Sequence, residues 1–112
     1  MKIKTSELIE EALDWAVGVV EGLGDIAPEV LVMSYMPSNN WATCGPLIEK
    51  YRISFVTIGT GPEDEQGNEP IVALTSGLHY KACQGKTHLV AACRAIVAAR
   101  LGDEVDVPEM GS

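Results

Sequence analysis

Apolar residues near the start of the chain recur at steps of three and four, which is the period of an amphipathic helix. Ile9, Leu13, Ala16 and Val20 mark this apolar stripe. The opposite stripe is polar or small and consists of Glu7, Glu10, Glu11, Asp14, Gly18 and Glu21. We therefore predict a helix over residues 6–21, capped by Thr5 or Ser6 and ended by Gly22 and Gly24.

The next segment is divided by prolines. Val30–Met36 is a short apolar run with β-branched members, and it predicts a strand. Pro46 would clash with a preceding helical turn, so we predict no continuous helix through it. Instead, a short helix is expected over Pro46–Tyr51, because a proline costs nothing at the first helical position. A single turn over Ser38–Thr43, capped by Ser38 or Asn39, is expected to precede it.

Two later apolar runs, Ile53–Gly59 and Pro70–Ser76, predict the strands of a hairpin. Both faces of these strands are apolar, which implies that the sheet is covered on both faces. Residues 61–69 connect them and are rich in acidic and turn residues, which predicts a mobile acidic loop. Leu78–Ala82 is expected to form a further short strand.

The last strong pattern is an almost wholly apolar helix from Thr87 to Leu101, in which Arg94 and Arg100 are the main charges. Such a helix is buried on most sides. Thr87 is its natural N-cap, Gly102 its natural C′ residue, and residues 103–112 read as an acidic C-terminal tail. The elements together predict one α+β domain over residues 1–112. In it, a small, mainly antiparallel sheet of three to four strands is flanked by an N-terminal and a buried C-terminal helix, as in an α/β/α sandwich.

Charge narrows the range of partners. Eight Lys and Arg stand against 16 Asp and Glu, which gives a formal net charge of −8. The basic residues are spread along the chain, so direct binding of nucleic acid is not expected. Three cysteines at irregular spacing suit a reducing cytosol, and the acidic residues of the first helix interrupt any signal peptide. No apolar stretch is long enough for a membrane span, and we expect a cytoplasmic protein.

Three blocks of sequence resemble the phage-encoded NinX-like proteins. The blocks are residues 4–8 with 12–17, residues 35–41 with 45–49, and residues 91–97 with 102–105. That family has no known function, so the resemblance implies a phage or prophage origin and no activity. The chain is also distantly similar to phage α/β/α sandwich proteins. Residues 61–69 match nothing in the family, and Gly85-Lys86-Thr87 stands where a Gly-Pro-like start of the last helix is usual.

Several chemical motifs have simpler structural explanations. Gly85-Lys86-Thr87 before a helix suggests a phosphate-binding loop, but the glycine required five positions earlier is Tyr80. A glycine turn with a threonine cap explains it better, and only weak anion binding by Lys86 and Thr87 survives. The possible zinc ligands Cys44, His79, Cys83, His88 and Cys93 match no known spacing. We expect no metal and no cofactor.

The segment Tyr35–Glu49 carries the main site hypothesis. In a chain poor in aromatic residues, Tyr35 and Trp41 lie beside Asn39 and Asn40 in a tightly shaped loop. A buried Trp41 that anchors the short helix is the structural alternative. The functional interpretation is a pocket that grips a small ligand or a partner peptide. Arg94 would need a partner if buried, and Glu49 or a bound anion could supply one.

Three functions from different classes follow. The leading one is a non-catalytic phage accessory protein that binds a host protein or a small molecule. The second is an acidic mimic that inhibits a host DNA-binding enzyme. The third, a small enzyme, is weakest because no nucleophile–base pair is identifiable. The alanine-rich last helix could also form a homo-oligomer interface, which the sequence leaves open.

Overall fold

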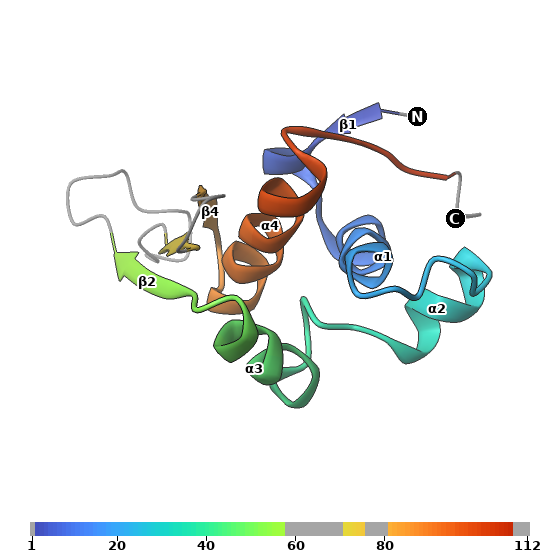
Figure 1. Ribbon diagram of the computed structural model, residues 1–112, viewed down its shortest axis with the longest axis horizontal. Helices are drawn as coiled ribbons and strands as arrows, with labels where there is room; N and C mark the ends of the chain where they lie inside the picture. The colour runs from blue at the N-terminus through green and yellow to red at the C-terminus, as the bar shows by residue number, and fades with distance from the viewer. Residues whose placement is uncertain (1, 58–70, 76–80, 109–112) are drawn as a thin grey trace.

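The computed structural model describes residues 2–57, 71–75 and 81–108 of the chain (Figure 1). In chain order the elements are β1 (Lys2–Lys4), the 3₁₀ helix η1 (Thr5–Glu7), α1 (Glu10–Val20), α2 (Pro28–Ser34), α3 (Trp41–Lys50), β2 (Ser54–Thr57), β3 (Ile71–Leu74), β4 (Ala82–Gly85), α4 (His88–Leu101) and β5 (Glu104–Asp106). The predicted α+β class is confirmed. None of the helices in these ranges is long and apolar enough to span a membrane.

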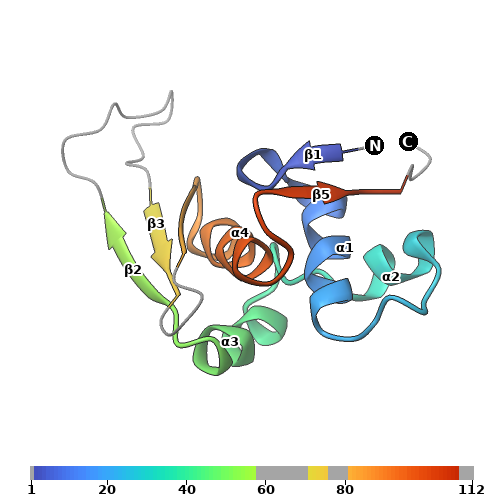
Figure 2. The same ribbon diagram turned by 45° about the horizontal axis from the view of Figure 1, so that its top comes forward.

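Helix α4 lies at the centre of the fold. It packs against β3 and β4 on one side and against α1 and α3 on the other, so that it separates the larger sheet from the remaining helices (Figure 2). Eight of its residues are buried: Leu89, Ala91, Ala92, Cys93, Ala95, Ile96, Val97 and Ala98. The predicted buried C-terminal helix is therefore confirmed, and the N-terminal helix flanks α4 rather than the sheet.

The larger sheet has the order β2-β3-β4 with antiparallel neighbours. Phe55 pairs with Ala73, and Ala73 pairs with Cys83. The predicted hairpin is thus confirmed where it is described, whereas residues 61–69 lie outside the described ranges. Of the strand expected over Leu78–Ala82, residues 78–80 lie outside the described ranges, Lys81 is not in a strand, and Ala82 begins β4.

The small sheet pairs β1 with β5 in antiparallel register and joins the two ends of the chain. Thr5 completes this closure, because its hydroxyl donates to the Gly102 carbonyl oxygen at 2.6 Å and its amide donates to that of Asp103 at 2.8 Å. Val105 and Val107 are buried. The acidic tail expected from residue 103 onward is therefore part of the fold as far as residue 108, because alternate apolar residues give its start a buried face.

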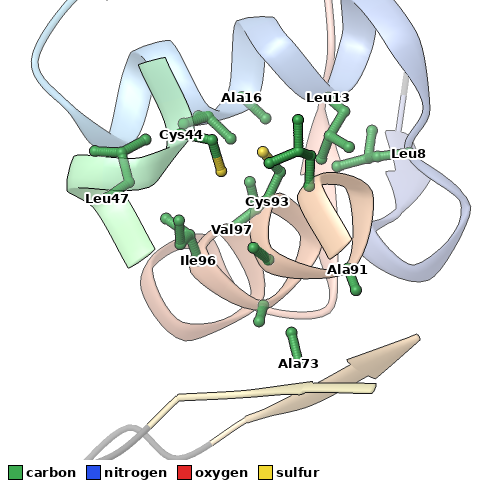
Figure 3. Packing of buried hydrophobic residues seen from close by; sticks show 14 of the residues in the cluster. Leu8, Leu13, Ala16, Cys44, Leu47, Ala73, Ala91, Cys93, Ile96 and Val97 are labelled. Carbon is green, nitrogen blue, oxygen red and sulfur yellow. The ribbon is translucent and has the colours of Figure 1, made fainter. Parts of the chain in front are cut away.

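One aliphatic core joins these elements, with alanines and cysteines filling the space between helices (Figure 3). Leu13 and Ala16 from α1 meet Cys93 and Val97 of α4, and Cys44 comes from α3. Alanine side chains are small, so the helices can pack closely together. This close packing fills an aliphatic core that has few aromatic residues.

The strand predicted over Val30–Met36 is wrong, because residues 28–34 form helix α2. Pro28 occupies a first-turn position, where its ring favours helical geometry. Leu31 fits against Gly18 of α1 so closely that a Cβ atom at Gly18 would lie 2.7 Å from Leu31 Cδ2. This tertiary contact outweighs the β-propensity of the run.

The prediction that no helix runs through Pro46 is also wrong. Helix α3 spans Trp41–Lys50 with Pro46 inside it. Gly45 removes one of the obstacles, because a proline disfavours helical geometry in the preceding residue partly by a clash with that residue's Cβ, which glycine lacks. The cap is Asn40, whose side chain accepts from the Ala42 amide at 2.9 Å, and not Ser38 or Asn39.

Helix α1 is confirmed over most of its predicted length but starts at Glu10, and neither Thr5 nor Ser6 caps it. Its supposed polar stripe is partly internal, since Asp14 and Gly18 are buried. Gly22 ends the helix in the left-handed region at φ +87°, whereas Gly24 has no positive φ. The Asp14–Gly18 face of α1 therefore packs against the following segment instead of facing solvent.

The start of α4 follows the prediction. Thr87 caps the helix by accepting from the Val90 amide at 3.1 Å, and Gly102 ends it at φ +92°. Gly85 lies directly before this start, at the end of β4. A Cβ atom there would stand only 2.5 Å from the Ala91 backbone nitrogen, so β4 and α4 approach more closely than any other residue at this position would allow.

Candidate functional site

Two adjoining cavities lie where α1, the loop after α2 and the start of α4 meet. The larger has a volume of about 850 Å³ and the smaller of about 520 Å³. Ser38, Asn39, Lys86 and Thr87 line both, and we call the joined space the α1–α4 groove. Segments distant in sequence thus form a single concave surface, which is the usual form of a ligand site.

One wall of the groove is fixed by a buried carboxylate. The Asp14 side chain is 4% exposed and accepts a hydrogen bond from the Ser38 amide at 2.8 Å. Burial raises the pKa of Asp14, while the hydrogen bonds with Ser38 lower it in part. This bond holds the loop after α2 against α1, so it determines where Ser38 and Asn39 lie.

Glu10 and Glu11 line the same wall at the start of α1. Glu10 has φ +52°, which is unusual for a residue other than glycine. Backbone strain of this kind is often found at functional sites, and here it occurs at a residue that lines the groove.

Arg94 projects from α4 into the larger cavity. Its Nε donates to the Leu8 carbonyl oxygen and its Nη1 to that of Gln84, each at 2.9 Å. Burial lowers the pKa of this guanidinium, but an arginine keeps its charge throughout the physiological range. Within the described ranges, Arg94 has no carboxylate within ion-pair distance. Of the two partners considered for Arg94, Glu49 is therefore not paired with it, and the backbone carbonyls of Leu8 and Gln84 take that place.

Aromatic rings border the smaller cavity. Trp41 is 59% exposed, so the alternative of a buried anchor for α3 is excluded. Its ring lies 6.3 Å from that of His88, and the His88 ring meets Phe55 edge-on at 4.9 Å. Trp41 and His88 both line this cavity, which gives it an apolar aromatic side beside the amide of Asn39.

Lys86 and Thr87 bring the start of α4 into the groove. Thr87 is occupied as a cap, whereas Lys86 is exposed and makes no side-chain bond within the described residues. The first amides of a helix carry partial positive charge. Lys86, Arg94 and this helix end therefore bring positive charge into a cavity that Glu10 and Glu11 also line.

Some residues of the original hypothesis lie outside the groove. Tyr35 is half-buried against the core, and burial raises the pKa of its hydroxyl. Glu49 is exposed on α3, and Asn40 serves as the cap of that helix. Asn39, Trp41, Lys86, Thr87 and Arg94 are the residues that the structure brings together.

The thiols do not reach the groove. The sulfur atoms of Cys44 and Cys93 face each other inside the core (Figure 3). The hydrogen bond between the two thiols, together with burial, raises the pKa of Cys93. Cys83 is half-buried, and burial raises its pKa as well. No group of three His, Cys, Asp or Glu residues in the described ranges could hold a metal ion, and His79 lies outside those ranges.

A family model described as "Bacteriophage P22, NinX" matches residues 4–100, which include the whole groove. The chain belongs to this phage NinX family. Among curated proteins, no match to the chain was found. NinX membership carries no activity with it, so the function of this NinX-family chain has to be argued from its groove.

The sequence of the NinX chain did not indicate Asp14, Ser38 and His88 as groove residues. Asp14 had been assigned to a solvent-exposed stripe. One signal was available, since Gly18 lies one helical turn after Asp14, and a glycine inside a helix often marks a close packing contact. His88 carried no such signal, because its place beside Trp41 depends on how α3 and α4 meet.

Proposed function

We propose that this NinX-family chain is a non-catalytic accessory protein that binds a host protein or a small molecule in the α1–α4 groove. The observation that carries the proposal is the convergence of Asn39, Trp41, Lys86 and Arg94, from two separate stretches of the chain, on adjoining cavities. Such a site offers an amide, an aromatic face and two cations within one concave surface.

The groove's chemistry favours a ligand with an anionic group and an apolar part. Arg94 and Lys86 provide positive charge that no ion pair neutralises within the described ranges, and charge-assisted hydrogen bonds to them would orient an anionic group. Val32, Met36 and Val90 line the same cavity and suit an apolar body. A cationic group of the ligand would find Glu10 and Glu11 in the same cavity.

We assign no reaction to the groove because two of its ionisable side chains are used to hold its walls in place. Asp14 is buried and holds Ser38, and Arg94 holds two backbone carbonyls. These bonds fix the walls of the groove, which is typical of residues that position a binding surface. A binding protein needs no more than this.

Affinity purification tests the proposal. The tagged chain is recovered from infected cells, and both proteins and small molecules that elute with it are identified by mass spectrometry. Lys86→Gln is the groove variant, because Lys86 is exposed and its loss should not affect folding. Lys4→Gln, at an exposed lysine on β1, is the matched control.

We expect at least one protein or small molecule that the wild type and Lys4→Gln retain and that Lys86→Gln retains about tenfold less, since a bond to a charged group contributes about 1.5–3 kcal/mol. Identical retention by all three proteins would refute the assignment of the groove. Retention of nothing specific by the wild type would count against a binding function altogether.

A further inference from the structure

The net negative charge of the chain comes from one segment. Residues 5–49 contain eight of the 16 acidic residues and no Lys or Arg, whereas all eight basic residues lie outside and are balanced there by the other eight acidic ones. The eight are Glu7, Glu10, Glu11, Asp14, Glu21, Asp25, Glu29 and Glu49. The formal net charge of −8 therefore belongs to the half of the fold that contains α1 and α2.

Little of this charge is neutralised locally. Glu21 forms an ion pair with Lys50 at 2.9 Å. Asp25 and Glu29 are exposed beside α2, and neither is within ion-pair distance of a base in the described part of the chain. Two carboxylates that no described ion pair neutralises therefore lie at the start of α2.

The same region exposes large apolar side chains. Helix α2 packs on α1 through Leu31 and Val32, and at the edge of the molecule it presents its other side outward (Figure 1). Ile26 is 39% exposed, Val30 58% and Met33 78%. We call these three residues the α2 ridge. Val30 and Met33 are three residues apart and therefore share one face of the helix.

We propose that the α2 ridge docks a basic amphipathic helix of a partner protein. The apolar face of such a helix would cover Val30 and Met33, while its Lys and Arg residues would lie beside Asp25 and Glu29. Methionine adapts its shape to different partners and is frequent on surfaces of this kind. This surface is distinct from the α1–α4 groove, so the inference goes beyond the proposed function.

Charge complementarity also argues against other occupants. Two copies of the chain meeting at the ridge would bring two strongly negative segments together, and like charges disfavour that contact. An electrostatic mimic of nucleic acid would attract basic surfaces without needing the apolar side chains. The exposed apolar residues among the carboxylates therefore favour a partner that is both basic and amphipathic.

A synthetic peptide of about 18 residues, roughly five helical turns, serves as the probe. It carries Leu on one face and Lys on the other, and a scrambled isomer has the same composition without the faces. Binding to the full chain is followed by fluorescence anisotropy at physiological ionic strength. The ridge variant is Val30→Ser with Met33→Ser, and the control is Val56→Ser, at a residue that is 49% exposed on β2.

We expect the wild type and Val56→Ser to bind the amphipathic peptide at least about tenfold more tightly than its isomer, and the ridge variant to lose this preference. Asp25→Asn with Glu29→Gln should weaken binding and flatten its salt dependence. Lys86→Gln should leave peptide binding unchanged, so failure here is separable from failure of the groove.

Three results would overturn the inference. Equal binding of both peptides would indicate a purely electrostatic surface, and unchanged binding by the ridge variant would place the contact elsewhere. A dimer in sedimentation that the ridge variant converts to monomer would show that a second copy occupies the ridge. Met33→Ser alone replaces the double variant if the latter unfolds at a lower denaturant concentration than wild type.

Discussion

Gly85→Ala should destabilise the protein more than its single added methyl group suggests. The new Cβ atom would stand 2.5 Å from the Ala91 nitrogen, 2.9 Å from its Cα and 3.1 Å from its Cβ. Ordinary contacts begin near about 3.5 Å, so the first turn of α4 would have to retreat from β4 by about 1 Å. The two nearest obstructing atoms are backbone, and the third is a Cβ atom, so no side-chain rotation can move any of them.

Overpacking of this kind typically costs about 1–3 kcal/mol, and we expect about 2–3 kcal/mol because α4 packs against both sheet and helices. For a domain of this size the melting temperature should fall by about 8–12 °C. Urea unfolding followed by circular dichroism gives the free energy directly. Gly24→Ala is the control, since its Cβ would meet nothing closer than 3.9 Å. Equal midpoints for Gly85→Ala and wild type would refute the close approach of β4 and α4.

Three further predictions concern Asp14, Thr87 and the cysteines. Burial raises the pKa of Asp14 above its value in the unfolded chain, so its contribution to stability falls as the pH rises from the unfolded-state pKa to the folded-state pKa. The free energy of unfolding of Asp14→Asn minus that of wild type should therefore increase with pH. A difference that stays constant across the pH range in urea titrations would contradict this prediction. Thr87→Ala should lose about 1 kcal/mol by removing the cap on Val90, and Thr87→Ser should retain most of it; equal unfolding midpoints for Thr87→Ala and wild type would disprove the cap. A thiol reagent should label Cys83 first in the native protein, because Cys44 and Cys93 are buried; labelling of all three at one rate would show that the core opens easily.

The sequence predicted those elements whose own pattern decides their structure. Helix α4 has an apolar run, a Thr87 cap and a Gly102 end, so local and tertiary preferences agree. The hairpin of β2 and β3 follows from two β-rich runs for the same reason. Arg94 was accordingly predicted to lie on this helix, as it does, although its hydrogen-bond partners could not be predicted from the sequence.

The errors fall where a tertiary contact outweighs local preference. The pattern of Val30–Met36 predicts a strand, but Leu31 of helix α2 packs directly against Gly18, where there is no side chain. Pro46 reads as a helix start, but Gly45 before it permits helical geometry to continue through. Because α2 and α3 border the groove region, its walls depended on contacts that no local pattern shows.

The groove combines residues that local pattern made candidates with an arrangement that only tertiary contacts decide. Arg94 and Lys86 were candidates for separate reasons, and only the packing of α4 against β4 and α1 brings them to the same cavity as Asn39. Glu49 was a reasonable partner for Arg94 on charge alone. The partners of Arg94 are instead the Leu8 and Gln84 carbonyls. They could not be predicted, because backbone acceptors leave no mark in a sequence.

Amide NMR spectra of the full chain, titrated with a library of small anionic and neutral fragments, test the binding groove most directly. We expect fragments that bind to shift the amides of Ser38, Asn39, Lys86 and Thr87 together, because these residues line both cavities, and we expect Lys86→Gln to reduce the shifts caused by the anionic ones. Shifts confined to other surfaces, or a response that Lys86→Gln leaves unchanged, would contradict the assignment of the groove as the binding site.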